Sequence, residues 1–314
     1  MKVLVTGANG FVAKHLILEL LNRNHEVIAG VRDRNLEGLM GAKKIYLDVT
    51  DSKGMESVLK EIELDAIIHL AAQSKINVGW NLPVATFEVN TLATIQLVQL
   101  ISEFSPRTKL ITVGSSEEYG ISGKYHEKIN ESVPCLPQNP YASSKLAAGE
   151  VGLQLAKKNN VSLLHVRPFN HFGPGQAEGF VMSDFSAQIA RIEYGLTEPV
   201  IYVGDLSSQR DFTDVRDIVR AYTLLVESDA EIGIYNVSSG IPRKIKDILL
   251  YLISISTCDI KIQVNPNKFR PSEVPIFIGD YSKISKTVNW TPEIDFYDSL
   301  KETLNWWRVI TKGN

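Results

Sequence analysis

The sequence predicts an α/β protein, organised as a doubly wound parallel sheet followed by a smaller mixed α/β lobe. Short apolar segments alternate with amphipathic ones through the first half of the chain, and a glycine turn joins the first pair. Strands that alternate with helices form a parallel sheet covered on both faces, which binds ligands at the carboxyl ends of its strands. The expected strands are residues 2–6, 26–31, 44–47, 65–70, 109–113 and 161–166. The expected helices are residues 14–22, 52–61, 83–104, 140–158, 180–195 and 296–310.

Composition narrows the partners that the chain can have. Its 314 residues are 44% hydrophobic and 22% charged, as in a globular protein with a large core. The formal net charge of −3 argues against nucleic acid or an anionic membrane as a partner. No apolar run approaches the ~20 residues of a membrane span. Cys135 and Cys258 lie far apart and form no metal-ligand spacing. We therefore expect a cytoplasmic protein with free thiols and no metal.

The first turn of the chain has the features of a dinucleotide site. Gly7 permits a tight turn, Gly10 lets the backbone approach a pyrophosphate, and Ala13 lets the next helix pack closely on the strand. The free N–H groups at the start of that helix would bind the phosphates. The spacing is one residue wider than the common fingerprint, and an ordinary strand-to-helix turn is the alternative. The cofactor residues expected on this turn are Gly7, Asn9, Gly10, Phe11 and Val12.

The residues after the second strand bear on the choice between NADP and NAD. Arg32 stands where an NAD-preferring site carries a carboxylate, and Asp33 and Arg34 follow it. A guanidinium suits a 2′-phosphate, so NADPH is favoured, while Asp33 keeps NAD open. Further cofactor contacts are expected at the ends of later strands and on the helix 83–104, namely Asp48, Val49, Leu70, Ala71, Ala72, Gln73 and Asn90.

These features divide the chain into two expected parts. Residues 1–166 form a Rossmann-type domain that binds NADP, and residues near 205–238 return to it. Residues 167–314 form mainly a lobe that binds the substrate.

The stretch that joins the fifth strand to the helix 140–158 carries the candidate chemistry. Tyr141 and Lys145 lie four residues apart, which places both side chains on one helix face. An ammonium beside the phenol is expected to lower the pKa of Tyr141 toward neutrality, which suits general acid–base catalysis. Ser115, on the loop before, can donate a hydrogen bond to the same reacting oxygen. A solvated helix face that carries Tyr-x-x-x-Lys by chance is the alternative.

Two helices carry apolar residues on more than one side. They are residues 83–104 and 140–158, and each needs cover besides the sheet. A second subunit that completes a four-helix bundle would supply it, which predicts a homodimer. Cover by the C-terminal segment of the same chain is the alternative.

Taken together, the glycine turn, Ser115 and the Tyr141–Lys145 pair resemble the extended short-chain dehydrogenase/reductase family over essentially the whole chain. The resemblance implies that Tyr141 donates or accepts the proton, that Lys145 holds the nicotinamide ribose, and that Ser115 orients the substrate oxygen. It also implies that Pro168 and Phe169 border the nicotinamide and that Asn170 contacts substrate.

Two later segments resemble the branch of that family that acts on GDP-linked sugars. They are Gln209-Arg210-Asp211-Phe212 and Phe269-Arg270-Pro271-Ser272-Glu273-Val274. The resemblance implies that Arg210 and Arg270 meet a diphosphate and that Glu273 accepts from ribose hydroxyls, whereas a salt bridge from Arg210 to Asp211 or Asp214 is the alternative. The expected substrate residues are Ser74, Ser115, Ser116, Glu117, Asn170, Arg210, Arg270, Ser272 and Glu273.

The reaction class is the remaining choice. Glu117 stands where the dehydratases of this branch carry the base that removes a proton as water leaves. The loop from Asp33 to Lys43 lacks the longer insertion of those dehydratases, which favours NADPH-dependent reduction of GDP-4-dehydro-6-deoxy-D-mannose to GDP-D-rhamnose. GDP-mannose 4,6-dehydration, another nucleotide-sugar epimerase or reductase, and a non-catalytic NADP sensor are the alternatives. Rhamnose and talose products are not distinguished by the sequence.

Overall fold

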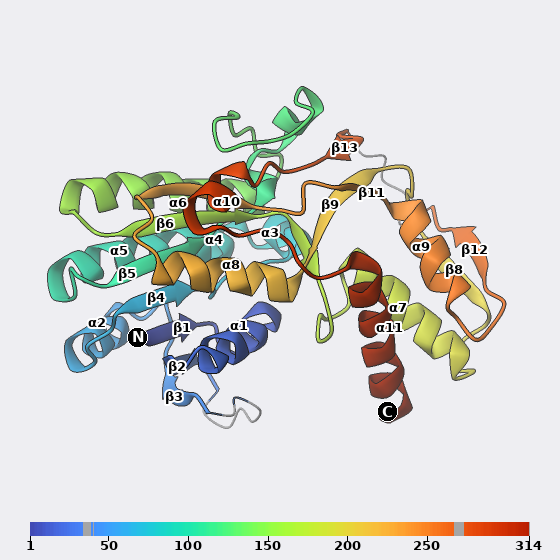
Figure 1. Cartoon of the computed structure of the whole chain (residues 1–314), viewed down its shortest axis with the longest axis horizontal. Coiled ribbons are helices and arrows are strands. Elements are labelled where there is room, and N and C mark those ends of the chain that lie inside the picture. The colour runs from blue at the N-terminus through green and yellow to red at the C-terminus, as the bar shows by residue number, and fades with distance from the viewer. Residues whose placement is uncertain (34–38, 40, 267–272, 314) are drawn as a thin grey trace.

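A seven-stranded parallel sheet forms the centre of the larger part of the molecule, as the computed structural model shows (Figure 1). The structure describes residues 1–33, 39, 41–266 and 273–313. The spatial order of the strands is β10-β6-β5-β4-β1-β2-β3. Their bounds are β1 Lys2–Thr6, β2 Glu26–Val31, β3 Lys43–Tyr46, β4 Ala66–His69, β5 Lys109–Val113, β6 Leu163–Pro168 and β10 Gly233–Val237. The predicted doubly wound α/β fold is therefore confirmed.

Helices cover both faces of this sheet because its strands are apolar on both sides. In β1, Val3 and Val5 belong to one core cluster and Leu4 to the other. Alternate residues of a strand point to opposite faces, so the continuous apolar run is what a doubly covered strand requires. The first cluster includes residues of α1 (Phe11–Asn22), α8 (Val215–Glu227) and α10 (Ser282–Val288). The second includes residues of α2 (Ser52–Glu61), α5 (Ala93–Phe104) and α6 (Pro140–Asn159).

The strand order reverses direction next to β1, and this reversal sets the place for a ligand. The chain runs from β1 outward through β2 to β3, then returns to β4 on the other side of β1. The carboxyl edge next to this reversal is where doubly wound sheets bind ligands. Gly7 and Ala71 follow these two strands, and a Cβ added to Gly7 would lie 2.8 Å from the Ala71 Cα.

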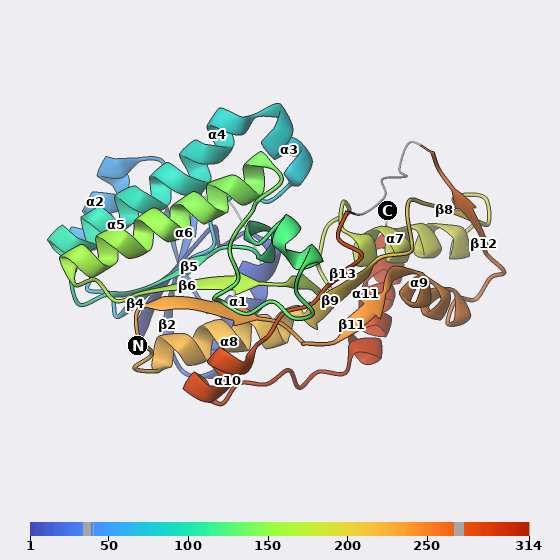
Figure 2. The ribbon, with the colours of Figure 1, turned by 90° about the horizontal axis from the view of Figure 1, so that it is seen from above.

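A second lobe lies beyond the carboxyl edge and holds two small sheets (Figures 1 and 2). One sheet has the order β11-β9-β13, with β7 also paired to β9, and the other pairs β12 with β8. The helices of this lobe pack on one apolar cluster. The bounds are β7 Asn170–Phe172, β8 Val200–Val203, β9 Gln209–Asp214, β11 Pro242–Lys244, β12 Lys261–Val264, β13 Ile276–Phe277, α7 Val181–Glu193, α9 Ile245–Ser254 and α11 Phe296–Gly313.

The chain passes between the two parts more than once. After β6 it enters the second lobe, returns through α8 and β10 to the large sheet, and leaves again at β11. Within the segment near 205–238, β9 belongs to the smaller sheet, whereas α8 and β10 lie with the larger one. The C-terminal helix α11 packs on α7. The alternative that the C-terminal segment covers the helices 83–104 and 140–158 is therefore wrong.

The long apolar helix differs from its expected form. Residues 83–104 comprise α4 (Pro83–Phe87), a π-helical turn at Glu88–Leu92, and α5. A short helix, α3 (Ile76–Asn81), precedes it and was not foreseen. By length and composition Pro83–Phe104 could cross a membrane, but half of its most apolar window is buried in the fold, as in a core helix. The π-helical turn matters for the site because it carries the buried Asn90.

A single buried carboxylate joins the segments where the two parts meet. Asp211 on β9 accepts hydrogen bonds from the Ser239 N–H (2.8 Å), the Ser239 hydroxyl (2.6 Å), the Gly240 N–H (2.8 Å) and the Gly279 N–H (3.1 Å). Burial raises the pKa of this carboxyl, while those donors act in the opposite direction. Asp211 thereby fixes the strand that carries Arg210.

We predict that Asp211→Ala lowers the free energy of unfolding by about 3 kcal/mol or more, because several buried donors lose their acceptor. Chemical denaturation measures this loss. Asp259→Ala, which removes an exposed carboxylate, is the control and should change the free energy by less than about 0.5 kcal/mol. A loss for Asp211→Ala as small as that of the control would contradict the structural role.

Candidate active site

Tyr141 and Lys145 lie at the start of α6, where the sequence fixes the helix end. Asn139 caps the helix by accepting a hydrogen bond from the Ala142 N–H at 2.8 Å, and Pro140 occupies the first turn. Tyr141 is 9% exposed and Lys145 is 7% exposed. The α3 helix packs so closely on Tyr141 that a Cβ added to Gly79 would lie 3.1 Å from the Tyr141 backbone nitrogen. The pair is therefore buried, which excludes the alternative of a solvated helix face.

The loop after β5 brings Ser115 to this pair. The Ser115 side chain is the neighbour that acts to lower the pKa of the Tyr141 phenol. The Lys145 Nζ donates to the Val113 carbonyl at 2.7 Å, which ties the helix to the end of the strand that delivers Ser115. Ser115 Oγ also accepts from the Glu117 N–H at 3.2 Å and caps the short helical turn that follows. The three residues predicted to act together are thus in one place.

The protonation of this pair differs from the prediction. Burial raises the pKa of Tyr141 to about 12, with Ser115 acting in the opposite direction and the charges of Glu117 and Glu118 raising it further. Burial also lowers the pKa of Lys145 to about 8. The expectation that the ammonium lowers the pKa of Tyr141 is wrong, because loss of water disfavours the phenolate more than any neighbour favours it. A phenol with this pKa keeps its proton at neutral pH.

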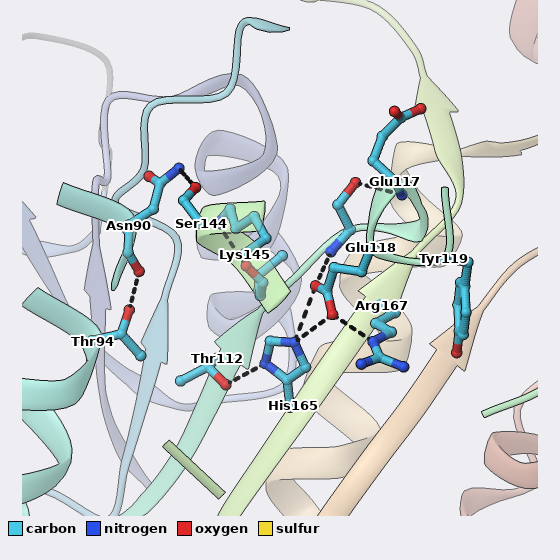
Figure 3. A network of polar contacts seen from close by, with 12 residues as sticks. Asn90, Thr94, Thr112, Glu117, Glu118, Tyr119, Ser144, Lys145, His165 and Arg167 are labelled. Carbon is cyan, nitrogen blue, oxygen red and sulfur yellow. Dashed lines mark hydrogen bonds and ion pairs between the residues drawn. The ribbon is translucent and has the colours of Figure 1, made fainter. Parts of the chain in front are cut away.

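Glu117 joins the reacting pair to the second lobe. Asn139 Nδ2 donates to Glu117 Oε2 at 3.3 Å. Burial raises the pKa of Glu117, while Asn139 and the positive charge of Arg210 act against this rise. Figure 3 shows the Glu117 side chain pointing away from the Glu118 carboxylate. A carboxylate therefore lies between the Tyr141 helix and Arg210 on β9, where it can contact a substrate that spans the two parts.

The turn after β1 fits the pyrophosphate of a dinucleotide. Gly7 has φ of +65°, which favours glycine, and Gly10 begins α1 without a side-chain cap. A Cβ added to Gly10 would meet only the Gly7 carbonyl, at 3.2 Å, within 4 Å. The first turn of α1 holds no acidic residue, so its N–H groups can receive an anion. Asn9 and Gly10 are exposed, whereas Phe11 and Val12 are half-buried.

Residues at the other strand ends line the same edge. Arg32 and Asp33 are exposed, and the charge of Arg32 contributes to a lowered pKa of Asp48, behind hydrogen bonds from Thr50. Val49 is buried, and the segment 70–73 is half-buried. Ser74 is exposed beside that segment. Arg34 lies outside the described residues.

Asn90 supports the cofactor edge from within the protein. Its Oδ1 accepts from the Gln73 N–H at 2.9 Å, and its Nδ2 donates to the Gln73 carbonyl and to Ser144 Oγ. All of these partners belong to the chain, and Asn90 is 2% exposed. The π-helical turn directs this side chain onto the loop after β4, and the expected contact of Asn90 with the cofactor stays a prediction. Asn90 holds that loop against the Tyr141 helix.

The predicted substrate residues divide into described and undescribed ones. Arg210 is half-buried, and its Nη1 donates to the Gln209 carbonyl at 2.8 Å. The alternative was a salt bridge from Arg210 to Asp211 or Asp214. Asp211 instead accepts hydrogen bonds from Ser239, Gly240 and Gly279, and Asp214 pairs with Arg216. Asn170 begins β7 and is half-buried, Phe169 and Ser116 are buried, Pro168 ends β6, and Glu273 is exposed. Arg270 and Ser272 lie outside the described residues.

The structure also contains a buried polar network that the sequence did not reveal. His165 and Arg167 both contact the Glu118 carboxylate (Figure 3), which also accepts from the Ser115 backbone N–H. The spacing in sequence gave no signal, because His165 and Arg167 lie on β6, far along the chain from Glu118. Over the described ranges, no cluster of His, Cys, Asp or Glu could hold a metal ion.

Comparison with known proteins agrees with this arrangement. The family described as GDP-mannose 4,6 dehydratase matches residues 4–303. GDP-6-deoxy-D-mannose reductase of Pseudomonas aeruginosa is 33% identical over 306 residues, which cover 98% of this chain and 97% of the relative. A GDP-mannose 4,6-dehydratase of Vibrio cholerae is 26% identical over 345 residues, which cover 96% of this chain and 92% of the relative.

Solved structures show the same similarity in three dimensions. RMD from Pseudomonas aeruginosa complexed with NADPH superimposes with a TM-score of 0.88 and 30% identity, over 98% of this chain and 99% of that one. The UDP-glucose 4-epimerase of Thermus thermophilus in complex with NAD gives a TM-score of 0.84 and 26% identity, over 98% and 99% of the two chains. With its glycine turn, its buried Ser115–Tyr141–Lys145 site and a family match over nearly its full length, the chain belongs to the GDP-mannose 4,6-dehydratase family.

Proposed function

We propose that the protein reduces the 4-keto group of GDP-4-dehydro-6-deoxy-D-mannose with NADPH and forms GDP-D-rhamnose. The observation that carries this proposal is the burial of Tyr141 and Lys145 together at the start of α6, with Ser115 acting on the phenol from the loop after β5. Reduction of a ketone needs a proton donor at the carbonyl oxygen, and a phenol with a pKa of about 12 is protonated at neutral pH.

Each residue of the site has a role in this reaction. A nicotinamide cofactor held at the Gly7–Val12 turn would supply the hydride for the carbonyl carbon. Ser115 and Tyr141 orient the carbonyl oxygen between their hydroxyl groups, and Tyr141 gives it a proton. Lys145, held by the Val113 carbonyl, stabilises the phenolate that remains. The burial that keeps the phenol neutral also strengthens this stabilisation, because charges interact more strongly in a low-dielectric site.

NADPH is the proposed cofactor, with NADH as the alternative. The turn from Gly7 to Val12 would hold its pyrophosphate at the start of α1. Arg32 would meet the 2′-phosphate, since it is exposed at the end of β2 and no carboxylate precedes it there. The solved relative at 30% identity was complexed with NADPH.

The lengths of two sequence alignments favour the reductase over the dehydratase. The alignment with the reductase of Pseudomonas aeruginosa spans 306 residues, fewer than the 314 of this chain. The alignment with the Vibrio cholerae dehydratase spans 345, so it requires insertions relative to this chain. Glu117 favours the dehydratase as the second candidate, because a carboxylate with a raised pKa near the reacting pair can remove a proton.

We also propose a cytoplasmic homodimer formed through the helices near 83–104, which are α4, the π-helical turn and α5, and near 140–158, which is α6. Figure 2 shows α4, α5 and α6 side by side at the edge of the molecule. Apolar side chains project from this edge, with Leu92 58% and Val84 72% exposed. A second copy of the same surface would cover them in a four-helix bundle. Both cysteines are free, as expected in a reducing compartment.

The first prediction separates the two reactions. We expect NADPH oxidation when the protein is given the 4-keto-6-deoxy GDP-sugar, and no reaction with GDP-mannose alone.

Tyr141→Phe should lower kcat by about 10²- to 10⁴-fold through loss of the proton donor while cofactor binding persists. The absorbance of NADPH and its fluorescence on binding measure these effects. Tyr125→Phe changes an exposed tyrosine and serves as the control. Loss of water from GDP-mannose without net cofactor use would refute the reductase, and a wild type that binds NADPH but turns over neither sugar would point to a non-catalytic sensor.

The second prediction concerns Glu117. If this carboxylate contacts sugar hydroxyls, Glu117→Gln raises KM for the keto sugar and lowers kcat by less than about 10-fold. If it is the base of a dehydratase, kcat for water loss falls by about 10²-fold or more. Steady-state kinetics with both sugars distinguish the two roles. Glu127→Gln, at an exposed carboxylate of the same segment, should leave both constants unchanged.

The third prediction tests the dimer by sedimentation at micromolar protein concentration. The wild type should sediment as a dimer, and Leu92→Glu should sediment as a monomer because a charge enters the apolar interface. Leu18→Glu, at an equally exposed position on α1, should remain dimeric. A monomeric wild type would rule out the proposed assembly.

A further inference from the structure

A fully buried ionic cluster lies beneath the reacting residues, and the proposed reaction does not use it. Glu118, His165 and Arg167 are 0%, 1% and 1% exposed. The Glu118 carboxylate accepts from Arg167 Nε at 2.6 Å, from His165 Nε2 at 3.2 Å, and from the Ser115 backbone N–H at 2.8 Å. Buried charges are costly unless they are paired and hydrogen-bonded. We therefore asked what function this buried ion pair has beside the reacting residues.

The Glu118 carboxylate meets one guanidinium and one imidazole in this cluster. Because a carboxylate only accepts hydrogen bonds, His165 Nε2 donates to Glu118, and His165 Nδ1 lies 2.9 Å from the Thr112 hydroxyl. Arg167 also lies over the Tyr119 ring at 4.8 Å. These partners lower the pKa of Glu118 against the effect of burial, which keeps the carboxylate ionised as an acceptor.

Two glycines, Gly114 and Gly149, flank the cluster, and a side chain at either position would collide with it. A Cβ added to Gly114 would lie 2.1 Å from Glu118 Oε1 and 2.4 Å from His165 Nε2. A Cβ added to Gly149 would lie 2.5 Å from His165 Nε2. Gly114 precedes Ser115, and Gly149 follows Lys145 by one turn of α6. The cluster therefore touches both segments that carry the reacting groups.

The contact with Ser115 has a direct geometric consequence. Ser115 lies between Gly114 and the short helical turn 116–118, and its side chain acts on the Tyr141 phenol by lowering its pKa. Its backbone N–H is fixed by Glu118 Oε1, while Glu118 itself is fixed by two side chains from β6. A buried ion pair on a strand of the sheet thus sets the position of a loop residue. Reacting groups must be held to within a fraction of an ångström to be effective.

We propose that Glu118 is a positioning residue, whose carboxylate, held by His165 and Arg167, fixes Ser115 against Tyr141 for proton transfer. This inference rests on the proposed function for its kinetic consequence but not for its structural one. The Glu118 side chain is fully buried, so it acts through the residues around it, and its hydrogen bond to the Ser115 backbone is the contact that sets the position of a reacting group.

The test combines kinetics with amide hydrogen exchange. Glu118→Gln keeps the size of the side chain but removes the charge that pairs with Arg167. We expect kcat to fall about 10- to 100-fold, because Ser115 shifts by a fraction of an ångström. KM for NADPH should stay within about twofold, because the glycine turn is untouched. In a Ser115→Ala background, Glu118→Gln should cause no further loss, since both changes remove one function. If the fold-losses in kcat from Ser115→Ala and Glu118→Gln multiply in the double variant, the effect of Glu118 is a general structural one and the proposal is overturned.

A second pair of variants keeps the test valid if Glu118→Gln fails to fold. His165→Gln retains a donor near Glu118 and should have nearly wild-type activity. His165→Leu removes the donor and should lower kcat about 3- to 10-fold, again with no loss in the Ser115→Ala background. Equal activity of the two His165 variants would contradict the proposed hydrogen-bond chain. Glu127→Gln, at an exposed site, is the matched control.

Hydrogen exchange tests the positioning without any substrate. The Ser115 amide should exchange at least about tenfold faster in Glu118→Gln or His165→Leu than in the wild type, while amides of β1 and β4 stay protected. Unchanged exchange at Ser115 would overturn the proposal even if activity falls. If the variants exchange faster but the wild type does not reduce the keto sugar, the positioning role is supported and the proposed reaction is contradicted. Failure of the positioning role and failure of the proposed reaction are therefore distinguishable.

Discussion

Burial of a phenol and an amine at one sheet edge is the constraint on which the site depends. Removing Tyr141 and Lys145 from water raises the pKa of the first to about 12 and lowers that of the second to about 8. Both shifts disfavour charge, as desolvation does. The site is therefore prepared for a reaction that delivers a proton from Tyr141 and leaves a phenolate beside Lys145. This direction matches ketone reduction, in which the oxygen must gain a proton as the carbon gains a hydride.

The fold provides this burial through close backbone contacts. The strand order reverses at β1, which sets the edge for the cofactor, and the α3 helix then packs on Tyr141 through Gly79. Asn90 joins the loop after β4 to α6, and Asp211 fixes the strand of Arg210 from the other side. Each of these contacts is made inside the protein, so the rigid parts hold the reacting groups before substrate arrives. Such preorganisation is a major source of catalytic power.

Local patterns in the sequence predicted much of the fold but less of the electrostatics. Apolar strands, the turn at Gly7 and Gly10, and the spacing of Tyr141 and Lys145 are local features, and they placed the sheet and the reacting helix. The shift of the Tyr141 pKa depends on burial by α3, which no pattern indicated. Glu118 is surrounded by partners 47 and 49 residues away on β6, so its burial follows only from the pairing of β5 with β6. The π-helical turn that redirects Asn90 was missed for the same reason, since its cause is tertiary packing.

The central claim is that burial keeps Tyr141 protonated in the free enzyme despite its neighbouring amine. Ultraviolet difference titration tests it most directly, because ionisation of a tyrosine gives a distinct absorbance change. The spectrum of the wild type minus that of Tyr141→Phe should show no tyrosinate signal between about pH 6 and pH 9. This pH range lies below the ordinary tyrosine pKa near 10. A tyrosinate signal that titrates near neutral pH and disappears with Tyr141 would contradict the account, and would restore the amine as the dominant influence on the phenol.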